Sequence, residues 1–254
     1  ISATADPNPP IVLCSSMVIA FPVFFISSVS SSLSIGFIVD IFITVVFMYL
    51  FRKNTHPIRH VWGQIQTFLM SFTIKNVSKP DEKATLLVMN HQSLVDIVAL
   101  EASYPKDLCW IAKEELKKIP LFGHVIRAPR MIAIDRKDKR SIIKIIKEGK
   151  ERLEEGRVLA IFPEGTRNES TQLLPFQSGA KVLAEKLNLI VQPLVITGAR
   201  YVFDSKRLEA HGGGEVQLIY LDPIDPKQDP NWYEKLQQTM QERLDSELAN
   251  ASCH

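Results

Sequence analysis

The first fifty residues constrain this chain most, because they are almost without charge. Asp6 and Asp40 are their only acidic residues, and all 30 Lys and Arg residues come later. This stretch holds two apolar segments, 11–29 and 33–51, separated by a run of serines. As a helix each would be about 28 Å long, close to the thickness of a bilayer core. A simple soluble domain is therefore a poor account of the whole chain.

Both apolar segments depart from an ideal membrane span. Pro22 and several Ser residues interrupt the first, and Asp40 lies near the middle of the second, where an isolated carboxylate is costly. A shallow hairpin in one leaflet is therefore as consistent with the pattern as two full spans. A cleaved signal peptide is a further alternative, although the basic start that it needs is missing.

Basic residues begin directly after the second segment, with Arg52, Lys53 and Arg59. Positive residues beside a membrane segment favour the cytoplasmic side. We therefore expect residues 1–53 to form a membrane-anchoring helical hairpin at the cell (inner) membrane, and residues 54–254 to form a cytoplasmic domain. The bilayer is the expected partner of the first part.

The composition of the whole chain excludes several classes of protein. With 254 residues, 46% hydrophobic and 23% charged, the chain has enough apolar residues for a substantial core, which argues against disorder. Its net charge of +2 gives no reason to expect a nucleic-acid partner. The three cysteines show neither metal-ligand nor disulfide spacing, so we expect structural thiols in a reducing compartment.

After residue 54, short apolar runs alternate with longer helical patterns. Strands are predicted over 85–89, 108–112, 131–134, 158–162, 189–196 and 216–221, and several of them are apolar on both faces. Helices are predicted over 60–72, 94–103, 139–154, 179–187 and 231–248. This alternation predicts an α/β fold, a mixed and largely parallel sheet covered by helices, preceded by the hydrophobic hairpin.

His91 and Asp96 are the first candidates for chemistry. In one regular helix these two side chains would point about 140° apart. They can meet only if His91 lies in the loop after strand 85–89 and Asp96 lies in the first turns of the next helix. An Asp that accepts from one imidazole nitrogen leaves the other as a base for an alcohol proton. The alternative is that His91 merely precedes the helix and Asp96 interacts with its dipole.

Cations follow three other predicted strands. Lys113 follows strand 108–112, Arg136 follows strand 131–134, and Arg167 follows strand 158–162. A guanidinium at a strand end is suited to a phosphate. Taken singly, each has an ordinary explanation as a surface charge. Together with an oriented His91 they predict an anion site.

Four blocks in these regions carry a resemblance to a known family. They are Asn-His-Gln-Ser-Leu-Val-Asp (90–96), Ile-Asp-Arg (134–136), Phe-Pro-Glu-Gly-Thr-Arg (162–167) and Val-Gln-Pro-Leu (191–194). In order and spacing they resemble the glycerolipid acyltransferase family, and most closely its bacterial 1-acylglycerol-3-phosphate (lysophosphatidic acid) acyltransferases. The likeness extends over about residues 54–226.

The resemblance implies transfer of a fatty acyl group from an acyl-carrier-protein or coenzyme A thioester to the sn-2 hydroxyl of lysophosphatidic acid. It implies that His91 is the general base, that Asp96 orients it, and that no acyl-enzyme forms. It assigns the acceptor to a set of substrate-binding residues: Lys113, Arg136, Glu164, Gly165, Thr166 and Arg167, with Pro193 bounding the pocket. It implies no metal and no cofactor beyond the thioester.

Other functions stay open at this stage. Alternative acceptors are glycerol 3-phosphate, another lysophospholipid and an ornithine lipid. A non-catalytic lipid-binding scaffold is a second alternative, disfavoured by the intact His91 and Asp96. A membrane-anchored hydrolase is disfavoured because the sequence has no Gly-x-Ser-x-Gly motif.

Overall fold

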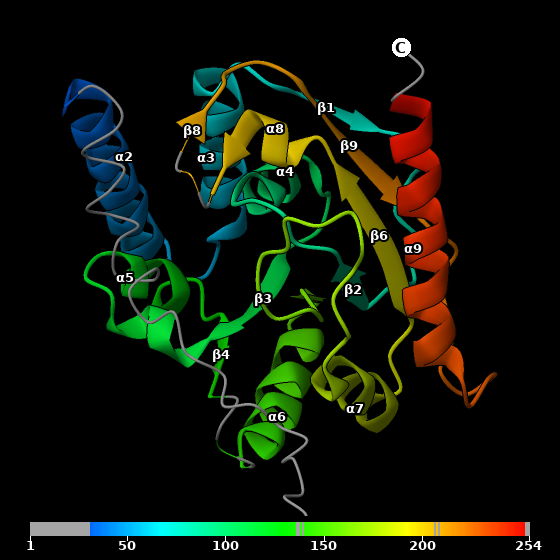
Figure 1. The fold of residues 1–254 in the computed structure, drawn as a ribbon. Helices are drawn as coiled ribbons and strands as arrows, with labels where there is room; N and C mark the ends of the chain where they lie inside the picture. The colour runs from blue at the N-terminus through cyan, green and yellow to red at the C-terminus, as the bar shows by residue number, and fades with distance from the viewer. Residues whose placement is uncertain (1–30, 136–137, 139, 206, 208, 252–254) are drawn as a thin grey trace, which may run out of the picture.

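The computed structural model describes residues 31–135, 138, 140–205, 207 and 209–251 (Figure 1). These residues form a seven-stranded sheet in the order β1-β9-β6-β2-β5-β3-β4. β9 runs antiparallel to β6, and the other neighbouring pairs of this sheet are parallel. The prediction of a mixed, largely parallel sheet with helices is therefore confirmed. The strands are β1 (Thr73–Asn76), β2 (Leu86–Met89), β3 (Leu108–Lys113), β4 (Ile132–Ile134), β5 (Val158–Ile161), β6 (Val191–Thr197) and β9 (Glu215–Tyr220).

The central strands are apolar on both faces because helices cover both faces. Every residue of β2 and β5 is buried, as expected for parallel strands between two helical layers. The connection from β2 to β3 moves along the sheet in one direction, and the connection from β5 to β6 moves in the other. Right-handed crossovers therefore place α4 (Val95–Ser103) on one face and α7 (Ser178–Leu187) on the opposite face. α6 (Ser141–Glu154) packs beside α7, and α9 (Trp232–Ala251) packs against β6 (Figure 1).

Helix α3 (His56–Leu69) packs closely on α4. It begins four residues before the predicted start, because Pro57 in its first turn fits the helical backbone without needing a hydrogen-bond partner for its nitrogen. Gly63 makes the close approach possible, since a Cβ there would lie 2.6 Å from the backbone nitrogen of Ala102. The two helices therefore meet almost backbone to backbone at this point.

Some short elements were absent from the prediction. β1 is polar and mostly exposed, because it lies at the edge of the sheet. β7 (Phe203–Asp204) and β8 (Glu209–Ala210) form a separate hairpin, and α8 (Ala199–Val202) precedes it. The 3-10 helix η1 (Glu114–Lys118) and α5 (Phe122–Arg127) follow β3. All of them are too short to show a clear hydrophobic period.

Helix α2 (Ser31–Leu50) covers most of the second apolar segment, and the first segment, 11–29, lies outside the described residues. Ile41, Val45 and Met48 on α2 are buried in a small cluster with Ala128. Within the part of the chain whose side chains are described, no helix is both long and apolar enough to cross a membrane. The prediction of a transmembrane helix is therefore not supported, and the hairpin stays a prediction.

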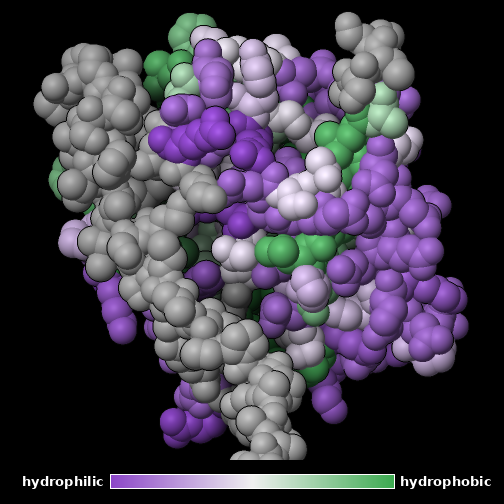
Figure 2. Space-filling view, viewed as in Figure 1, coloured by the Kyte–Doolittle hydropathy of each residue, from purple (hydrophilic) through white to green (hydrophobic). Residues whose placement is uncertain are grey.

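The outer surfaces of α2 and α3 are apolar. Their exposed large apolar residues are Val39, Phe42, Ile43, Val46, Phe47 and Leu50 on α2, Phe51 just after it, and Val61, Ile65, Phe68 and Leu69 on α3. Figure 2 shows apolar residues at the top of the molecule, over α3, on a face that is otherwise largely hydrophilic. We call these residues the α2–α3 apolar surface.

Asp40 joins α2 to α3. Its Oδ2 accepts hydrogen bonds from Trp62 Nε1 at 2.9 Å and from Gln66 Nε2 at 2.7 Å. Burial raises the pKa of Asp40, and these two hydrogen bonds offset part of the increase. The carboxylate that looked costly in the sequence therefore has two partners.

The raised pKa of Asp40 predicts a pH effect on stability. The folded chain binds this proton more tightly than the unfolded chain, so Asp40 contributes most below its unfolded pKa of about 3.9 and less as the pH rises through the folded pKa. Asp40→Asn keeps an acceptor oxygen but does not ionise. In urea unfolding, we expect the stability of wild type minus that of D40N to fall as the pH rises from about 4 toward neutral.

Asp229→Asn is the control of opposite sign, because the hydrogen bond from Lys235 lowers the pKa of Asp229. For this pair, the stability of wild type minus variant should rise with pH. A wild-type minus D40N difference that stayed constant or rose with pH would contradict the role given to Asp40.

Candidate active site

The candidate residues lie at the carboxyl ends of neighbouring parallel strands, which we call the carboxyl edge of the sheet. β2, β5, β3 and β4 are neighbours and run parallel, so their carboxyl ends meet at the same edge. His91 follows β2, Lys113 ends β3, and residues 164–167 follow β5. Carboxyl ends of parallel strands are where folds of this kind place ligand sites. The structure therefore brings together segments that are more than 70 residues apart in the sequence.

His91 and Asp96 are in direct contact. His91 Nδ1 lies 2.8 Å from Asp96 Oδ2, with His91 in the loop after β2 and Asp96 in the first turn of α4. The Asp96 side chain is 1% exposed, and the same oxygen accepts from the backbone N–H groups of Gln92 and Ser93. An ionised carboxylate can only accept hydrogen bonds, so the hydrogen bond to His91 requires that Nδ1 carries the proton. The contact between His91 and Asp96 across the strand-to-helix junction is the geometry that the sequence predicted, and Nε2 is the ring nitrogen that Asp96 does not contact.

The loop that carries His91 is fixed on both sides. The Asn90 side chain donates to the carbonyl of Ile196 and accepts from its N–H, which joins the end of β2 to β6. The buried Ser93 hydroxyl donates to the Phe203 carbonyl and accepts from the N–H of Val95. Ser93 therefore has a structural role at the start of α4.

Glu164 ties the loop after β5 to the loop after β2. One of its oxygens accepts from the His91 N–H at 3.2 Å, and the other accepts from Asn168 Nδ2 and from the N–H of Leu174. The side chain is buried, and burial raises its pKa. The Asn168 N–H in turn donates to the His91 carbonyl at 2.8 Å. Glu164 thus holds the two loops together through hydrogen bonds, and its carboxylate is buried away from solvent.

Gly165 makes the turn that follows. Its φ of +74° lies in the left-handed region, which a glycine adopts without strain, and its N–H donates to the Phe162 carbonyl. Thr166, the next residue, is exposed. The hydrogen bond from Gly165 closes a turn from Phe162 to Gly165, which leads the chain from β5 to Arg167.

Arg167 brings a cation to the His91–Asp96 pair. Burial lowers the pKa of its guanidinium, while the nearby Asp96 carboxylate raises it. Lys113 is half-buried at the end of β3, on the same edge. Arg136 lies outside the described residues, so its predicted place beside them is not tested.

Two aromatic side chains at the site had no signal in the sequence. The Phe162 ring stacks on the His91 ring, with centroids 3.8 Å apart and planes 15° apart. The Trp110 ring stacks on the other side of Phe162, with centroids 5.5 Å apart. Both residues belong to predicted strands, and strand periodicity does not show which side chains of neighbouring strands stack. The sheet order, which places β3 beside β5, is what brings them together.

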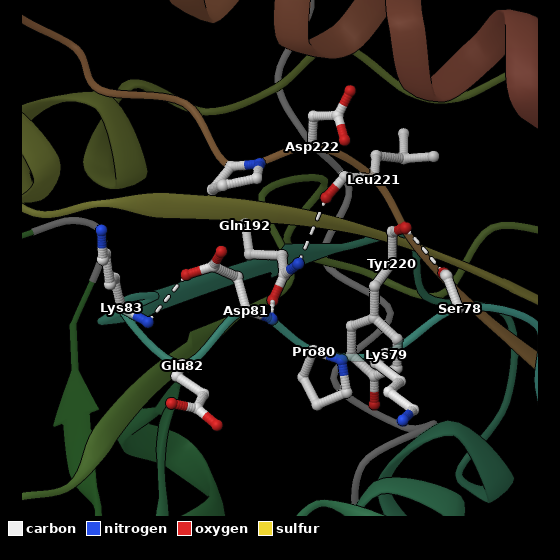
Figure 3. Close-up of a pocket in the computed structure, with 11 residues that line it drawn as sticks. Ser78, Lys79, Pro80, Asp81, Glu82, Lys83, Gln192, Tyr220, Leu221 and Asp222 are labelled. Atoms are coloured by element: carbon white, nitrogen blue, oxygen red, sulfur yellow. Dashed lines mark hydrogen bonds between the residues drawn. The ribbon is translucent and has the colours of Figure 1, made fainter.

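A cavity of about 530 Å³ lies at the opposite edge of the sheet (Figure 3). It is lined by residues 78–83 before β2, by residues 220–223 at the end of β9, and by Gln192 at the start of β6. Gln192 is committed to the fold, since it accepts from the Asp81 N–H and donates to the Leu221 carbonyl. Pro193 is buried within β6, in register with Val88. The fourth sequence block therefore lies within β6, in the strand predicted over 189–196, and the place of Pro193 at the boundary of the acceptor pocket stays a prediction.

The described residues contain no group of three or more His, Cys, Asp and Glu side chains placed to hold a metal ion. What they do contain at the carboxyl edge is an oriented imidazole, a buried carboxylate and a guanidinium. In this arrangement the imidazole can remove a proton from a hydroxyl group, and the guanidinium can bind a negatively charged group next to that hydroxyl.

Comparisons with known proteins agree with the blocks in the sequence. A family model described as Acyltransferase matches residues 71–197. The chain is 42% identical over 203 residues to a 1-acyl-sn-glycerol-3-phosphate acyltransferase of Helicobacter pylori, covering 78% of this chain and 85% of that relative. It is 30% identical over 229 residues to a probable 1-acyl-sn-glycerol-3-phosphate acyltransferase of Mycoplasma pneumoniae, covering 83% and 82%.

A solved structure has the same fold. The crystal structure of the 1-acyl-sn-glycerophosphate acyltransferase PlsC from Thermotoga maritima superimposes with a TM-score of 0.66. The match covers 92% of this chain and 95% of that one, at 24% sequence identity. At this identity the match establishes the fold alone.

Proposed function

The chain belongs to the acyltransferase family, and from that premise we propose that it acylates the sn-2 hydroxyl of lysophosphatidic acid to give phosphatidic acid. The relatives from Helicobacter pylori and Mycoplasma pneumoniae carry names of this activity and are covered over most of their length. The observation that carries the proposal is the His91–Asp96 contact, which leaves His91 Nε2 as a base at the ligand-binding edge of the sheet.

In the proposed reaction, His91 Nε2 takes the proton of the sn-2 hydroxyl as its oxygen attacks the thioester carbonyl. Asp96 stabilises the imidazolium that forms. The tetrahedral intermediate collapses to the new ester, and the departing thiolate takes the proton back from His91. No acyl-enzyme is needed, because a thioester is already activated and Ser93, the hydroxyl two residues away, is buried and hydrogen-bonded. The acyl donor is a coenzyme A or acyl-carrier-protein thioester, and no other cofactor enters.

The acceptor phosphate is assigned to the cations at the same edge. Arg167 lies close enough to Asp96 to interact with its charge, and Lys113 ends the neighbouring strand. Arg136 completes the proposed set, with Gly165 and Thr166 forming the turn beside them. A forked guanidinium suits a phosphate because it can donate two parallel hydrogen bonds.

We also propose that the chain works at the surface of the cell membrane. Its lipid substrate and product stay in the bilayer, since each buried CH₂ contributes about 0.8 kcal/mol. The α2–α3 apolar surface is the described part that would contact the lipid, and the exposed Arg52 and Lys53 lie beside it. These cations favour anionic headgroups of the cytoplasmic leaflet. Residues 1–53 would then anchor the domain over 54–254 on the cytoplasmic side.

A substitution in the α2–α3 apolar surface should weaken membrane binding. The side chain of Phe68 is 82% exposed, and placing a charge there removes an apolar group that we expect to enter the lipid. Phe68→Asp should lower the partition into phosphatidylglycerol-containing vesicles about tenfold in a sedimentation assay. Ile143→Asp is the matched control, because Ile143 is 68% exposed on α6 and away from that surface. Equal binding by F68D and I143D would contradict the proposed surface.

The activity itself is tested with the full chain in mixed micelles. Lysophosphatidic acid, glycerol 3-phosphate, a lysophosphatidylcholine and a lyso-ornithine lipid are compared as acceptors, each with acyl-carrier-protein and coenzyme A thioesters. We expect phosphatidic acid to be the main product. No preference for lysophosphatidic acid would overturn the proposed acceptor, and lipid binding without turnover would favour the scaffold alternative.

A further inference from the structure

The imidazole of His91 is supported on one face by a stack of rings. Phe162 lies 3.8 Å from it, centroid to centroid, and Trp110 lies beyond Phe162 at 5.5 Å. The hydrogen bond to Asp96 fixes one edge of the imidazole but still permits rotation about the line between the two groups. Face-to-face contact with Phe162 restricts that rotation. Between them, the two contacts determine where His91 Nε2 points.

The far end of the stack is anchored in the core. Trp110 is 8% exposed, and its Nε1–H donates to Glu101 Oε1 at 2.7 Å. The same Glu101 oxygen is bound by Arg59 of α3, and Arg59 also binds Asp107. The indole therefore has little freedom to slide, and Phe162 is held between it and the imidazole.

His91 becomes positively charged during the proposed reaction, and the Phe162 ring stacked on it interacts more favourably with the charged form. When Nε2 takes the hydroxyl proton, the ring becomes a cation over the face of Phe162. An aromatic face attracts a cation at this distance, more strongly where water is excluded. Phe162 would thus act together with Asp96 to stabilise the protonated base.

We propose that Phe162 and Trp110 are positioning residues for His91: Phe162 sets the plane of the imidazole and stabilises its protonated form, and Trp110 holds Phe162 in place. This inference rests on the proposed acyl transfer by His91. Neither ring is assigned a contact with the substrate, and the proton still moves from the acceptor hydroxyl to His91 Nε2 and then to the departing thiolate.

The test compares Phe162→Leu with Phe162→Tyr. Leu keeps an apolar side chain but removes the aromatic face, whereas Tyr keeps the face. We expect F162L to lower kcat about tenfold with little change in KM for either substrate. We also expect the acid limb of its pH–rate profile, and the NMR titration of the His91 ring proton, to move to lower pH by about one unit. F162Y should restore most of both.

Trp110→Phe tests the second ring against a matched control. It keeps an aromatic ring but loses the Nε1–H donor to Glu101, so we expect a smaller shift in the same direction as for F162L. Trp232→Phe loses a comparable hydrogen bond, from Trp232 Nε1 to Glu185 at 3.2 Å, in a buried tryptophan on α9. W232F should leave both the pH–rate profile and the His91 titration unchanged.

The outcomes are separable. An F162L enzyme with the kcat and pH–rate profile of wild type would overturn the inference. So would a lower kcat matched by a lower folded fraction in circular dichroism, with the His91 titration unmoved, because that result indicates a structural role only. If wild type transfers no acyl group, the proposed function fails, while the NMR titration of F162L against wild type still decides whether the stack acts on His91.

Discussion

Replacing His91 with Ala is expected to lower kcat for acyl transfer by about 10²- to 10⁴-fold, the range that a general base contributes. The variant removes the only group for which the described site provides both an orienting carboxylate and an available ring nitrogen at the carboxyl edge of the sheet. KM should change much less, because the acceptor phosphate is assigned to Arg167 and Lys113. Steady-state kinetics with the purified full chain, at saturating thioester, measure both constants.

Two further variants make the His91 result specific. Asp96→Asn places an amide where the carboxylate accepts from His91 and from two backbone N–H groups, so it should also reduce kcat strongly. His124→Ala is the matched control, since His124 lies on α5 and contacts Tyr49. Full activity in H91A, or equal losses in H91A and H124A, would refute the mechanism.

Replacing Arg59 with Met is expected to cost about 3–5 kcal/mol of folding free energy, the usual effect of removing one partner from a buried ion pair. Arg59 is 4% exposed and bridges Glu101 on α4 to Asp107. Asp107 would retain Arg157, but the Glu101 side chain is 5% exposed and would lose Arg59 as its ion-pair partner. Urea unfolding followed by circular dichroism measures the loss.

An exposed ion pair supplies the control for Arg59. Arg130 and Glu155 are 55% and 36% exposed, so Arg130→Met should cost below about 1 kcal/mol. Adding Glu101→Gln to R59M should recover part of the loss, because the buried negative charge is then removed. If R59M were no less stable than R130M, the buried network would not be a main support of α3.

The sheet and the His91–Asp96 contact were open to prediction from sequence because their signals are local. The apolar runs of β2 and β5 are buried on both faces, and the five-residue interval from His91 to Asp96 is compatible with contact only across a strand-to-helix junction.

Other features depend on contacts between distant segments and gave no such signal. Arg59 is 42 residues from Glu101 and 48 from Asp107, so nothing in a local window reveals that network. Trp110 and Phe162 stack only because β3 lies beside β5. β1 was missed because a short polar edge strand has no hydrophobic pattern.

Because Gly63 has no side chain, α3 lies at a short and fixed distance from α4. Without a Cβ, α3 rests on the backbone of α4 beside Ala102, and the first turn of α4 holds Asp96, the partner of His91. Under the docking we propose, α3 also carries part of the surface in contact with the lipid. The distance between His91 and the lipid surface is then set by the packing of α3 on α4, and not by the position of a movable loop.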